Sequence, residues 1–401
     1  MALTAVALTS GCGFAPGSDD SPVDAIFADA SSEAEADAQA NDPSEAARRR
    51  RYVRVNARAL ARAIGAAESG STRVFKLNLF EGEPITVVLE DVMRITDDNV
   101  TATGRIVGDS ESAVTLVMNK DVLLVNVRRG TSDEQFEVRY VGDGLHKVRE
   151  LLPDHGDEGC ETANSPGATA MSEEESLAES IASNEDDASP LATPVIDILA
   201  AYTPAARTKM GGIDAVTALI QLGIADTNRA LADSGVALAA RLVGIVALTQ
   251  NETGNWSSDL SALRSKTDGK WNAVHTERTR LGADQVSLVV SSPSGSVAGI
   301  GYVNASASTA FTITRTSAFK AYSFSHELGH NLGLNHTDGY VSSAGRFRTI
   351  IAYGTYPRAR RYSNPNLTYL GYKTGDSSHN ESSILNRNAY RVSSLISSLV
   401  R

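Results

Sequence analysis

Cysteine is nearly absent from this chain of 401 residues, which contains only Cys12 and Cys160. At most one intramolecular disulfide can form, so a small fold held together by several disulfides is excluded. Long apolar runs are missing as well. The apolar stretch that ends at Cys12 is too short to span a bilayer, and no other segment is long enough. A chain of this length is expected to form two domains joined by linkers.

Basic residues are absent from two stretches, residues 1–47 and residues 153–206, although both are rich in aspartate and glutamate. The formal net charge of −11 is therefore unevenly spread, since residues 195–401 carry 20 basic against 13 acidic side chains. We interpret residues 1–47 as a leader followed by a disordered acidic tether, and residues 161–193 as an acidic linker. An exposed linker of this kind is a site for proteolytic release.

The first cysteine ends the segment Leu8-Thr9-Ser10-Gly11-Cys12, which resembles a bacterial lipoprotein box. Thr9 stands where an aliphatic residue is preferred, and no basic segment precedes the apolar run. We expect a lipoprotein or secretory signal, and hence a protein exported from a bacterial cell and either secreted or lipid-anchored at the cell envelope. If Cys12 is lipidated, Cys160 has no partner for a disulfide.

Alternating apolar and polar residues characterise residues 48–160, as in Phe75, Leu77 and Leu79. Val- and Thr-rich runs with the same period lie at 100–107, 113–118, 122–127 and 135–141. No catalytic cluster appears in this part of the chain. The pattern predicts a β-rich N-terminal domain, which we interpret as a propeptide.

The remaining residues, 194–401, alternate between strand and helix patterns. Strands are expected at 195–202, 236–248, 285–291, 299–303 and 311–316, and helices at 213–233, 257–281, 318–331 and 383–399. Ser317 is a candidate N-terminal cap for the third helix. This order predicts an α/β domain with a mixed sheet.

The most informative motif lies in the third of these helices, where His326, Glu327, His330, Gly333 and His336 form the pattern H-E-x-x-H-x-x-G-x-x-H. Residues four apart lie on one face of a helix, so His326 and His330 can reach one ion at about 2.0–2.1 Å. Glu327 lies beside the first ligand, where a general base for water is needed.

A glycine at 333 allows the helix to end in a sharp turn, because glycine takes positive φ without steric cost. The turn returns His336 to the same ion. Three neutral ligands leave a fourth position open, which is typical of catalytic rather than structural zinc. The alternative interpretation is a surface helix with scattered histidines.

The motif, with its Gly333 and His336, resembles the metzincin clan of zinc endopeptidases, and residues 347–354 resemble the Met-turn of that clan. Further segments extend the resemblance: Ile196–Pro204, Gly299–Val303 and Tyr362–Asn366. Together they are most similar to the reprolysin-like bacterial peptidases of the peptidyl-Asp metallopeptidase family, over about residues 194–401. This resemblance implies a metzincin-like α/β (α+β) catalytic domain with a mixed twisted sheet and a zinc-site helix. It also implies that an extended substrate pairs antiparallel with the edge of the sheet.

One departure from the clan is Ile351, which stands at the methionine position of the Met-turn. Methionine there is an apolar floor beneath the zinc, not a ligand, and isoleucine has a similar volume. We therefore expect activity to be retained. Tyr353 lies where related families have a tyrosine that steadies the oxyanion, and the same role is one interpretation here. The other is a packed turn tyrosine.

Two further features are candidates for regulation and specificity. Cys160 lies just before the acidic linker, where its thiolate could occupy the open zinc position of a latent precursor; the alternative is an inert thiol. Arg358, Arg360 and Arg361 follow the Met-turn, where an arginine can pair with a substrate carboxylate. Such a pairing agrees with the Asp preference that the resemblance implies, whereas the alternative is a set of solvated arginines.

These observations predict a Zn²⁺-dependent metalloendopeptidase that hydrolyses extracellular proteins and prefers Asp on the C-terminal side of the cut. We expect polypeptide substrates, no nucleic acid, a membrane contact only through a lipid anchor at Cys12, and a monomer. One alternative is a weak or inactive zinc-binding surface lipoprotein that acts as a binding module, which Ile351 favours and Glu327 opposes. Another is zinc hydrolysis of a non-peptide amide.

Overall fold

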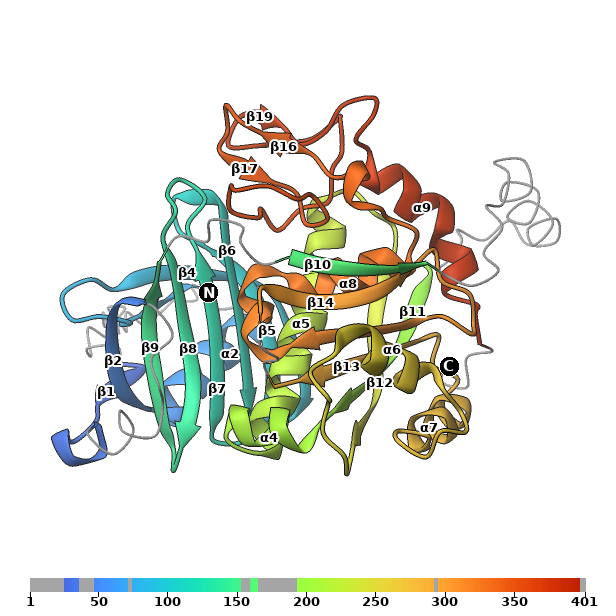
Figure 1. The fold of residues 1–401 in the computed structure, drawn as a ribbon. Helices are drawn as coiled ribbons and strands as arrows, with labels where there is room; N and C mark the ends of the chain where they lie inside the picture. Colours follow the sequence, from blue (N-terminus) through green and yellow to red (C-terminus); the bar gives the residue numbers. More distant parts are fainter. Residues whose placement is uncertain are drawn as a thin grey trace, which may run out of the picture.

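Two sheets lie side by side in the computed structural model, with a long helix between them (Figure 1). The structure describes residues 25–35, 47–70, 74–152, 159–164, 193–291 and 295–396. Cys12 and most of the predicted leader, tether and linker lie outside these residues. The mixture of helices and strands confirms the predicted α/β class.

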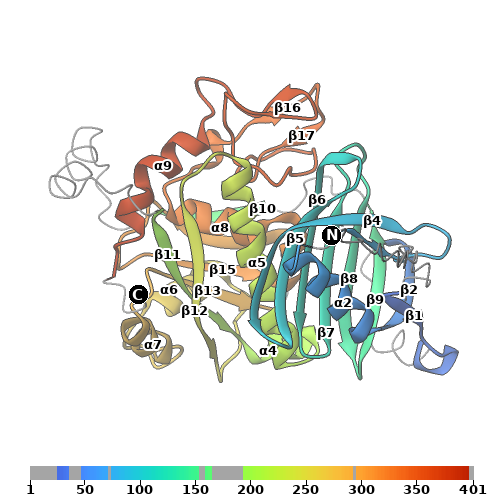
Figure 2. The same ribbon diagram turned by 180° about the vertical axis from the view of Figure 1, so that it is seen from behind.

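The N-terminal sheet is antiparallel throughout, in the order β1-β2-β9-β8-β7-β6-β5-β4-β3. Its strands are β1 Phe27–Asp29, β2 Ala47–Val55, β3 Val74–Leu77, β4 Ile85–Thr96, β5 Asn99–Ile106, β6 Asp109–Asn119, β7 Val122–Arg128, β8 Gln135–Gly142 and β9 Leu145–Leu151. Helix α2 (Ala57–Glu68) lies on one face and closes a separate apolar core (Figure 2). The β-rich character predicted for this part of the chain is confirmed.

Part of the predicted tether is ordered, because β1 pairs with β2. Ile26 and Phe27 are apolar and fully buried in the N-terminal core. The side chain of Asn78 holds the backbone of Phe27 through two hydrogen bonds of 3.0 and 2.7 Å. Two apolar residues within an acidic stretch are therefore sufficient to anchor this segment to the sheet.

The second sheet has the order β10-β14-β15-β13-β11-β12, and it is parallel except where β14 meets β15. Its strands are β10 Gly159–Asn164, β11 Val195–Tyr202, β12 Ala239–Ala247, β13 Gln285–Val290, β14 Val297–Val303 and β15 Phe311–Arg315. Strand β10 continues into the segment predicted as linker and pairs with β14, so β14 is not a free edge in this structure.

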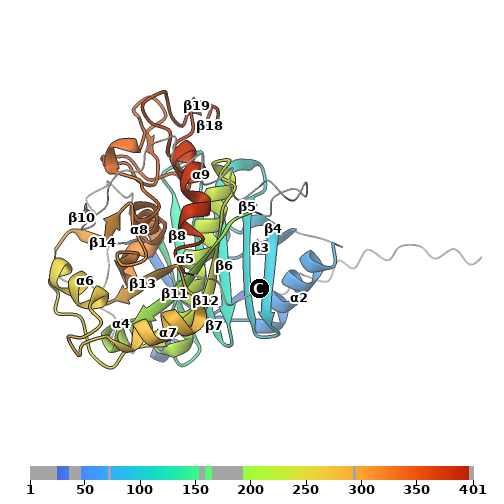
Figure 3. The ribbon, with the colours of Figure 1, turned by 90° about the vertical axis from the view of Figure 1, so that its right-hand side faces the viewer.

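Helices cover both faces of this sheet, so β11, the strand next to the edge strand β12, is buried on both sides (Figure 3). The even-numbered residues from Ile196 to Ala200 pack with α5 (Ile213–Asp233) and α8 (Ser323–Asn331). Leu199 and Ala201 pack with α6 (Trp256–Arg264) and α7 (Ala273–Leu281). Helix α5 also contacts the N-terminal sheet along β5, β6 and β7, and is therefore enclosed between the two sheets.

Two predicted helices differ from the structure. The helix expected at 257–281 is divided into α6 and α7, because a turn intervenes at Gly269, where φ is +80°. The helix expected at 318–331 begins as a 3₁₀ helix, Thr316–Ala321, and is interrupted at Tyr322, where φ is +59°. Tyr322, and not Ser317, occupies the N-cap position of α8.

The remaining elements are short except for the C-terminal helix α9 (Glu381–Val392), which begins two residues before the predicted range 383–399 and ends seven residues before its end. They are α4 Pro204–Met210, the 3₁₀ helix His336–Asp338, and the paired strands β16 Val341–Ser342 with β17 Phe347–Arg348 and β18 Thr368–Tyr369 with β19 Tyr372–Lys373. Among the described residues, no helix is both long and apolar enough to cross a membrane.

Candidate metal centre

Helix α8 and the turn after it bring three histidines together beneath strand β14. The Nε2 atoms of His326, His330 and His336 lie 3.1 to 3.2 Å from one another. Gly333 takes φ of +106°, as predicted, and a Cβ there would lie 2.5 Å from the side chain of Asn388. The glycine therefore permits the turn that returns His336 to the other two histidines.

The outward-facing nitrogens of two histidines are fixed by main-chain carbonyl groups. His326 Nδ1 lies 2.7 Å from the Ile350 oxygen, and His330 Nδ1 lies 2.8 Å from the Leu334 oxygen. A carbonyl oxygen can only accept a hydrogen bond, so each Nδ1 carries the proton and each Nε2 presents a lone pair. Burial also holds the pKa of His326 well below its usual value and lowers the pKa of His330 to about 4 and of His336 to about 3. The three rings are therefore neutral, as metal ligands must be.

The dimensions of this cluster fit a tetrahedral metal site. Ligand nitrogens at zinc–nitrogen distances of about 2.0–2.1 Å are separated by about 3.3 Å. The three Nε2 separations are close to this value. Exposed acidic side chains do not contribute, so the donor set is the nitrogen-rich one that zinc prefers.

Glu327 is fully buried next to the histidines, and burial raises the pKa of its carboxyl group to about 8. Its Oε1 atom has no hydrogen-bond partner among the residues that the structure describes. A Cβ added at Gly299 would lie 2.5 Å from this atom. The carboxyl group thus occupies a space that exists only because β14 carries glycine, and one of its oxygens is buried there without a hydrogen-bond partner among the described residues.

Gly299 and its neighbour Gly301 are functional residues that the sequence interpretation did not identify. A Cβ at Gly301 would approach the backbone oxygen of Glu327 to 3.1 Å. Two glycines in a predicted strand are a recognised sign that another backbone or ligand comes close. That signal was available in the sequence.

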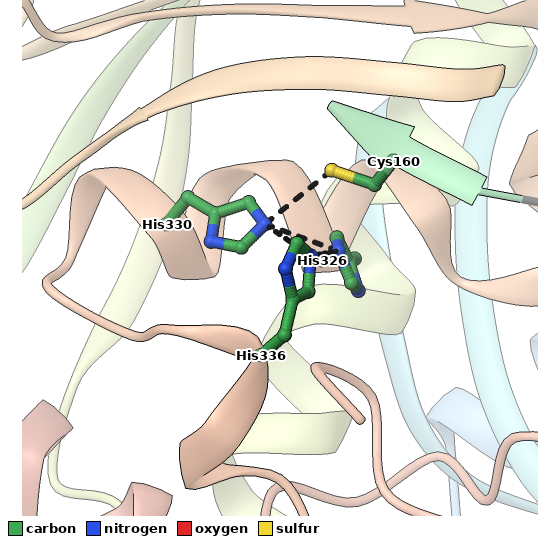
Figure 4. Close-up of side chains that lie close together, drawn as sticks. All are labelled: Cys160, His326, His330 and His336. Carbon is green, nitrogen blue, oxygen red and sulfur yellow. Dashed lines mark hydrogen bonds between the residues drawn. The ribbon is translucent and has the colours of Figure 1, made fainter. Parts of the chain in front are cut away.

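Cys160 lies on β10 and completes the cluster, although it is 166 residues from the first histidine (Figure 4). Its Sγ atom is 3.4 Å from His330 Nε2 and 3.3 Å from Glu327 Oε2. Sulfur and nitrogen ligands of one tetrahedral zinc ion are separated by about 3.5 Å. Sγ and the histidine ligand atoms all lie within 4.8 Å of one another, so a metal ion could have four protein ligands.

Tyr353 contacts both His336 and Cys160. Its ring stacks on His336, with the centroids 3.8 Å apart, and its hydroxyl donates a 2.5 Å hydrogen bond to the Cys160 carbonyl oxygen. The phenol therefore binds a main-chain carbonyl group directly beside the histidines. Because burial raises the pKa of this phenol to about 12, it keeps its proton and can act as a donor.

Ile351 is fully buried, and its side chain packs against Gly329 on the underside of α8. Its backbone N–H donates a 3.3 Å hydrogen bond to Glu381 Oε1, while Glu381 Oε2 accepts a hydrogen bond from the Ser363 N–H. Glu381 begins α9 and is also fully buried. This carboxylate, which the sequence interpretation missed, holds both ends of the loop that contains Tyr353.

Replacing Ile351 with methionine is expected to change the free energy of unfolding by less than about 1.5 kcal/mol, because the two side chains have similar volumes. Any catalytic activity of the metal centre should also change by less than about tenfold. Thermal unfolding and kcat/KM measured on both proteins test this expectation. A change from no activity to full activity would refute it.

The three candidate specificity arginines have different surroundings. Arg358 is buried, its Nη1 donates 3.1 Å hydrogen bonds to the Ala321 oxygen and the Ser323 hydroxyl, and its charge helps to lower the pKa of all three histidines. Arg360 lies 3.6 Å from Asp226 and 3.5 Å from Asp233.

Arg361 pairs at 2.8 Å with Glu111 of the N-terminal sheet. Of the three arginines, Arg358 is therefore the one that the structure brings to the metal centre. Arg348 supports its loop by donating 2.7 Å hydrogen bonds to the carbonyl oxygens of Tyr356 and Ala352.

Two buried histidines, a third that is partly buried and an adjacent buried carboxyl group form a site of the kind that metallopeptidases use. Residues 192–380 match the family described as Metallo-peptidase family M12B Reprolysin-like.

Several bacterial proteins are similar to this chain over about 200 residues. The peptidyl-Asp metalloendopeptidase of Stenotrophomonas maltophilia (strain K279a) is 33% identical over 205 residues, covering 46% of this chain and 48% of that protein. That of Xanthomonas campestris pv. campestris is 32% identical over 201 residues, covering 46% and 47%. The chain spans about half the length of these relatives. The crystal structure of metalloproteinase-II from Bacteroides fragilis aligns at 11% identity with a TM-score of 0.47, covering 75% of this chain and 92% of that chain.

Proposed function

We propose that this protein is a zinc metalloendopeptidase produced as a latent precursor. The observation that carries the proposal is β10, an extended segment that pairs with β14 directly over the histidine cluster. A site that accepts an extended main chain at the metal is suited to peptide bonds rather than to small amides. Glu327 supports an enzyme over a binding module, because zinc held for structure alone needs no general base.

The chemistry that a bound zinc ion supplies is Lewis acidity toward a carbonyl oxygen and toward water. His326, His330 and His336 would hold the ion. Glu327, with its raised pKa, accepts the proton of the attacking water and passes it to the leaving amine. The Tyr353 hydroxyl donates to the oxygen on which charge develops, as it now donates to the Cys160 carbonyl.

Latency is supported by the direction of β10 as well as by the thiol. Cys160 is paired with Gly299, and the two strands run parallel. A substrate of this clan runs antiparallel to the same strand, so β10 occupies the cleft with its peptide bonds reversed. The thiol in turn fills the position that water needs. We propose that residues 48–160 act as a propeptide on this basis.

A preference for Asp after the scissile bond is the finer part of the proposal. The relatives named as peptidyl-Asp metalloendopeptidases suggest it, and Arg358 is the residue we assign to it. Arg358 borders an open cavity of about 220 Å³ that residues 129–133 of the N-terminal domain also line. A guanidinium group in a dry site binds a carboxylate strongly and bidentately. Removal of the N-terminal domain would widen this cavity for a substrate side chain.

Replacing Arg358 with glutamine is expected to lower kcat/KM for peptides with Asp after the cut by about 10- to 100-fold. Peptides with Ala or Leu there should lose much less, because they do not use the charge. Initial rates on matched peptides measure this ratio. Arg346→Gln is the control, since Arg346 lines the same cavity but is exposed. Equal losses for all peptides would remove the specificity role.

Export remains a proposal that is based on the leader sequence. We propose that the protein reaches the cell envelope or the medium, with Cys12 as a candidate lipidation site, and that it acts as a monomer on polypeptides.

A zymogram on the full chain and on a chain lacking residues 1–192 tests the proposed function. The shortened chain should clear the gel, lose that activity with a chelator and regain it with zinc. A shortened chain that binds zinc but clears nothing would favour the binding-module alternative.

A further inference from the structure

The surface between the two sheets is the strongest unassigned feature of the molecule, because helix α5 provides one face of it. We define the docking face as the side chains of α5 that contact the N-terminal sheet: Asp214, Gln221, Asp226, Arg229 and Asp233. Each has a polar partner on that sheet. Polar contacts to the sheet therefore run along the whole length of the helix, and those at its two ends are ion pairs.

The centre of the docking face is dry. Thr115 on β6 donates a 2.6 Å hydrogen bond to Asp226, and both residues are buried. Around this contact, Val117, Val122 and Leu124 from the N-terminal sheet join the apolar cluster of the catalytic domain. A dry core of this kind holds two bodies together without a covalent link.

The ends of the docking face are ionic. Arg229 pairs with Glu90 at 2.8 Å and with Asp91 at 3.3 Å, while Arg105 lies 3.7 Å from Asp233. At the other end, Lys120 lies 2.8 Å from Asp214. These side chains are partly exposed, so they can be hydrated again if the sheets separate, and salt will weaken them.

The N-terminal sheet also has a core of its own, closed by α2 on the opposite side. The docking face therefore resembles an interface between two proteins more than the interior of one domain. The contact between the two domains also extends toward α8, because Gln135 donates a 2.7 Å hydrogen bond to the Lys320 carbonyl in the segment that leads into that helix.

From these contacts we propose that hydrolysis of one peptide bond between residues 164 and 193 does not activate the enzyme. The N-terminal fragment, which retains β10, stays docked on α5 as a detachable inhibitory subunit. Activation requires a second event that separates the N-terminal sheet from the docking face. This inference rests on the proposed function, since it concerns regulation of the same zinc site.

The test uses the full chain with a recognition sequence for a specific protease inserted between residues 165 and 192. After the cut, the two fragments should elute together at low salt and hydrolyse a quenched peptide at below about a tenth of the rate reached after dilution or 1 M salt. Separate elution, or full activity at once, would overturn the inference.

Variants at Arg229 test whether the ion pairs at this end of the docking face contribute to docking. Arg229→Glu places like charges opposite Glu90 and Asp91. The two fragments of the cut protein should therefore bind more weakly, with a dissociation constant about tenfold higher. Adding Glu90→Arg should restore docking. Lys266→Glu is the control, because Lys266 is exposed in the turn between α6 and α7. If Arg229→Glu leaves the dissociation constant of the two fragments unchanged, these ion pairs do not contribute to docking.

Failure of this inference can be distinguished from failure of the proposed peptidase function. If the separated C-terminal fragment clears a zymogram while the docked pair is silent, both proposals hold. If the fragment is silent after separation, the peptidase proposal fails, and co-elution alone still decides whether the N-terminal fragment stays docked.

Discussion

Replacing Glu327 with glutamine is expected to abolish peptide hydrolysis by the released domain while metal binding is retained. The amide has nearly the shape of the carboxyl group, so it fits the space beneath Gly299. It cannot accept a proton at neutral pH, and the loss of general base catalysis costs about 10²–10⁴-fold. The histidine nitrogens are held by the Ile350 and Leu334 carbonyl groups and not by Glu327, so their geometry should not change.

Three measurements separate this result from unfolding. Initial rates on a quenched peptide give the loss of activity, bound zinc is counted after dialysis, and the unfolding temperature reports stability. The temperature should be unchanged or higher, because a neutral amide replaces a carboxyl group that is fully buried. Glu277→Gln is the matched control on the exposed helix α7. Residual activity above about a tenth of normal would count against the general-base assignment.

The metal centre was predictable from the sequence because its parts are local. His326 and His330 are one helical turn apart, and Gly333 and His336 follow within six residues of His330. Short-range geometry therefore determines most of the site. The strands of the N-terminal sheet were predictable for a similar reason, since a period of two residues is visible within each strand.

What could not be predicted depends on contacts between distant parts of the chain. The sequence left open whether Cys160 reaches the fourth ligand position or is an inert thiol, because its place depends on the pairing of β10 with β14, whose partners lie more than 130 residues apart. Arg360 and Arg361 appear equivalent to Arg358 in the sequence. They differ only because Asp226, Asp233 and the N-terminal sheet surround them. No local sequence pattern indicates such long-range partners.

The break at Tyr322 is a third example. A non-glycine residue in the left-handed region is rare, and the sequence around it favours a continuous helix. Tertiary contacts determine the outcome, because Arg358 binds the residues on both sides of Tyr322 and Gln135 binds the Lys320 carbonyl. The start of the metal-binding helix is therefore defined by both domains.

Replacing Cys160 with alanine is expected to raise the activity of the intact precursor by at least about tenfold. The thiol would no longer fill the fourth ligand position, so water could enter beside Glu327. Activity should still be below that of the released domain, because the backbone of β10 would remain paired with β14 and the Tyr353 hydroxyl would still bind the carbonyl of residue 160.

The measurement must be made on uncut protein, so mass spectrometry of each sample accompanies the initial rate. Thr162→Ala is the control, because Thr162 lies two residues along β10 on the same side of the strand. Cobalt substitution provides a readout that does not depend on turnover. The precursor should show a thiolate-to-cobalt charge-transfer band that is absent from Cys160→Ala. An intact variant that is as silent as the wild type would mean that the reversed strand alone blocks the cleft, and that the thiol is inert.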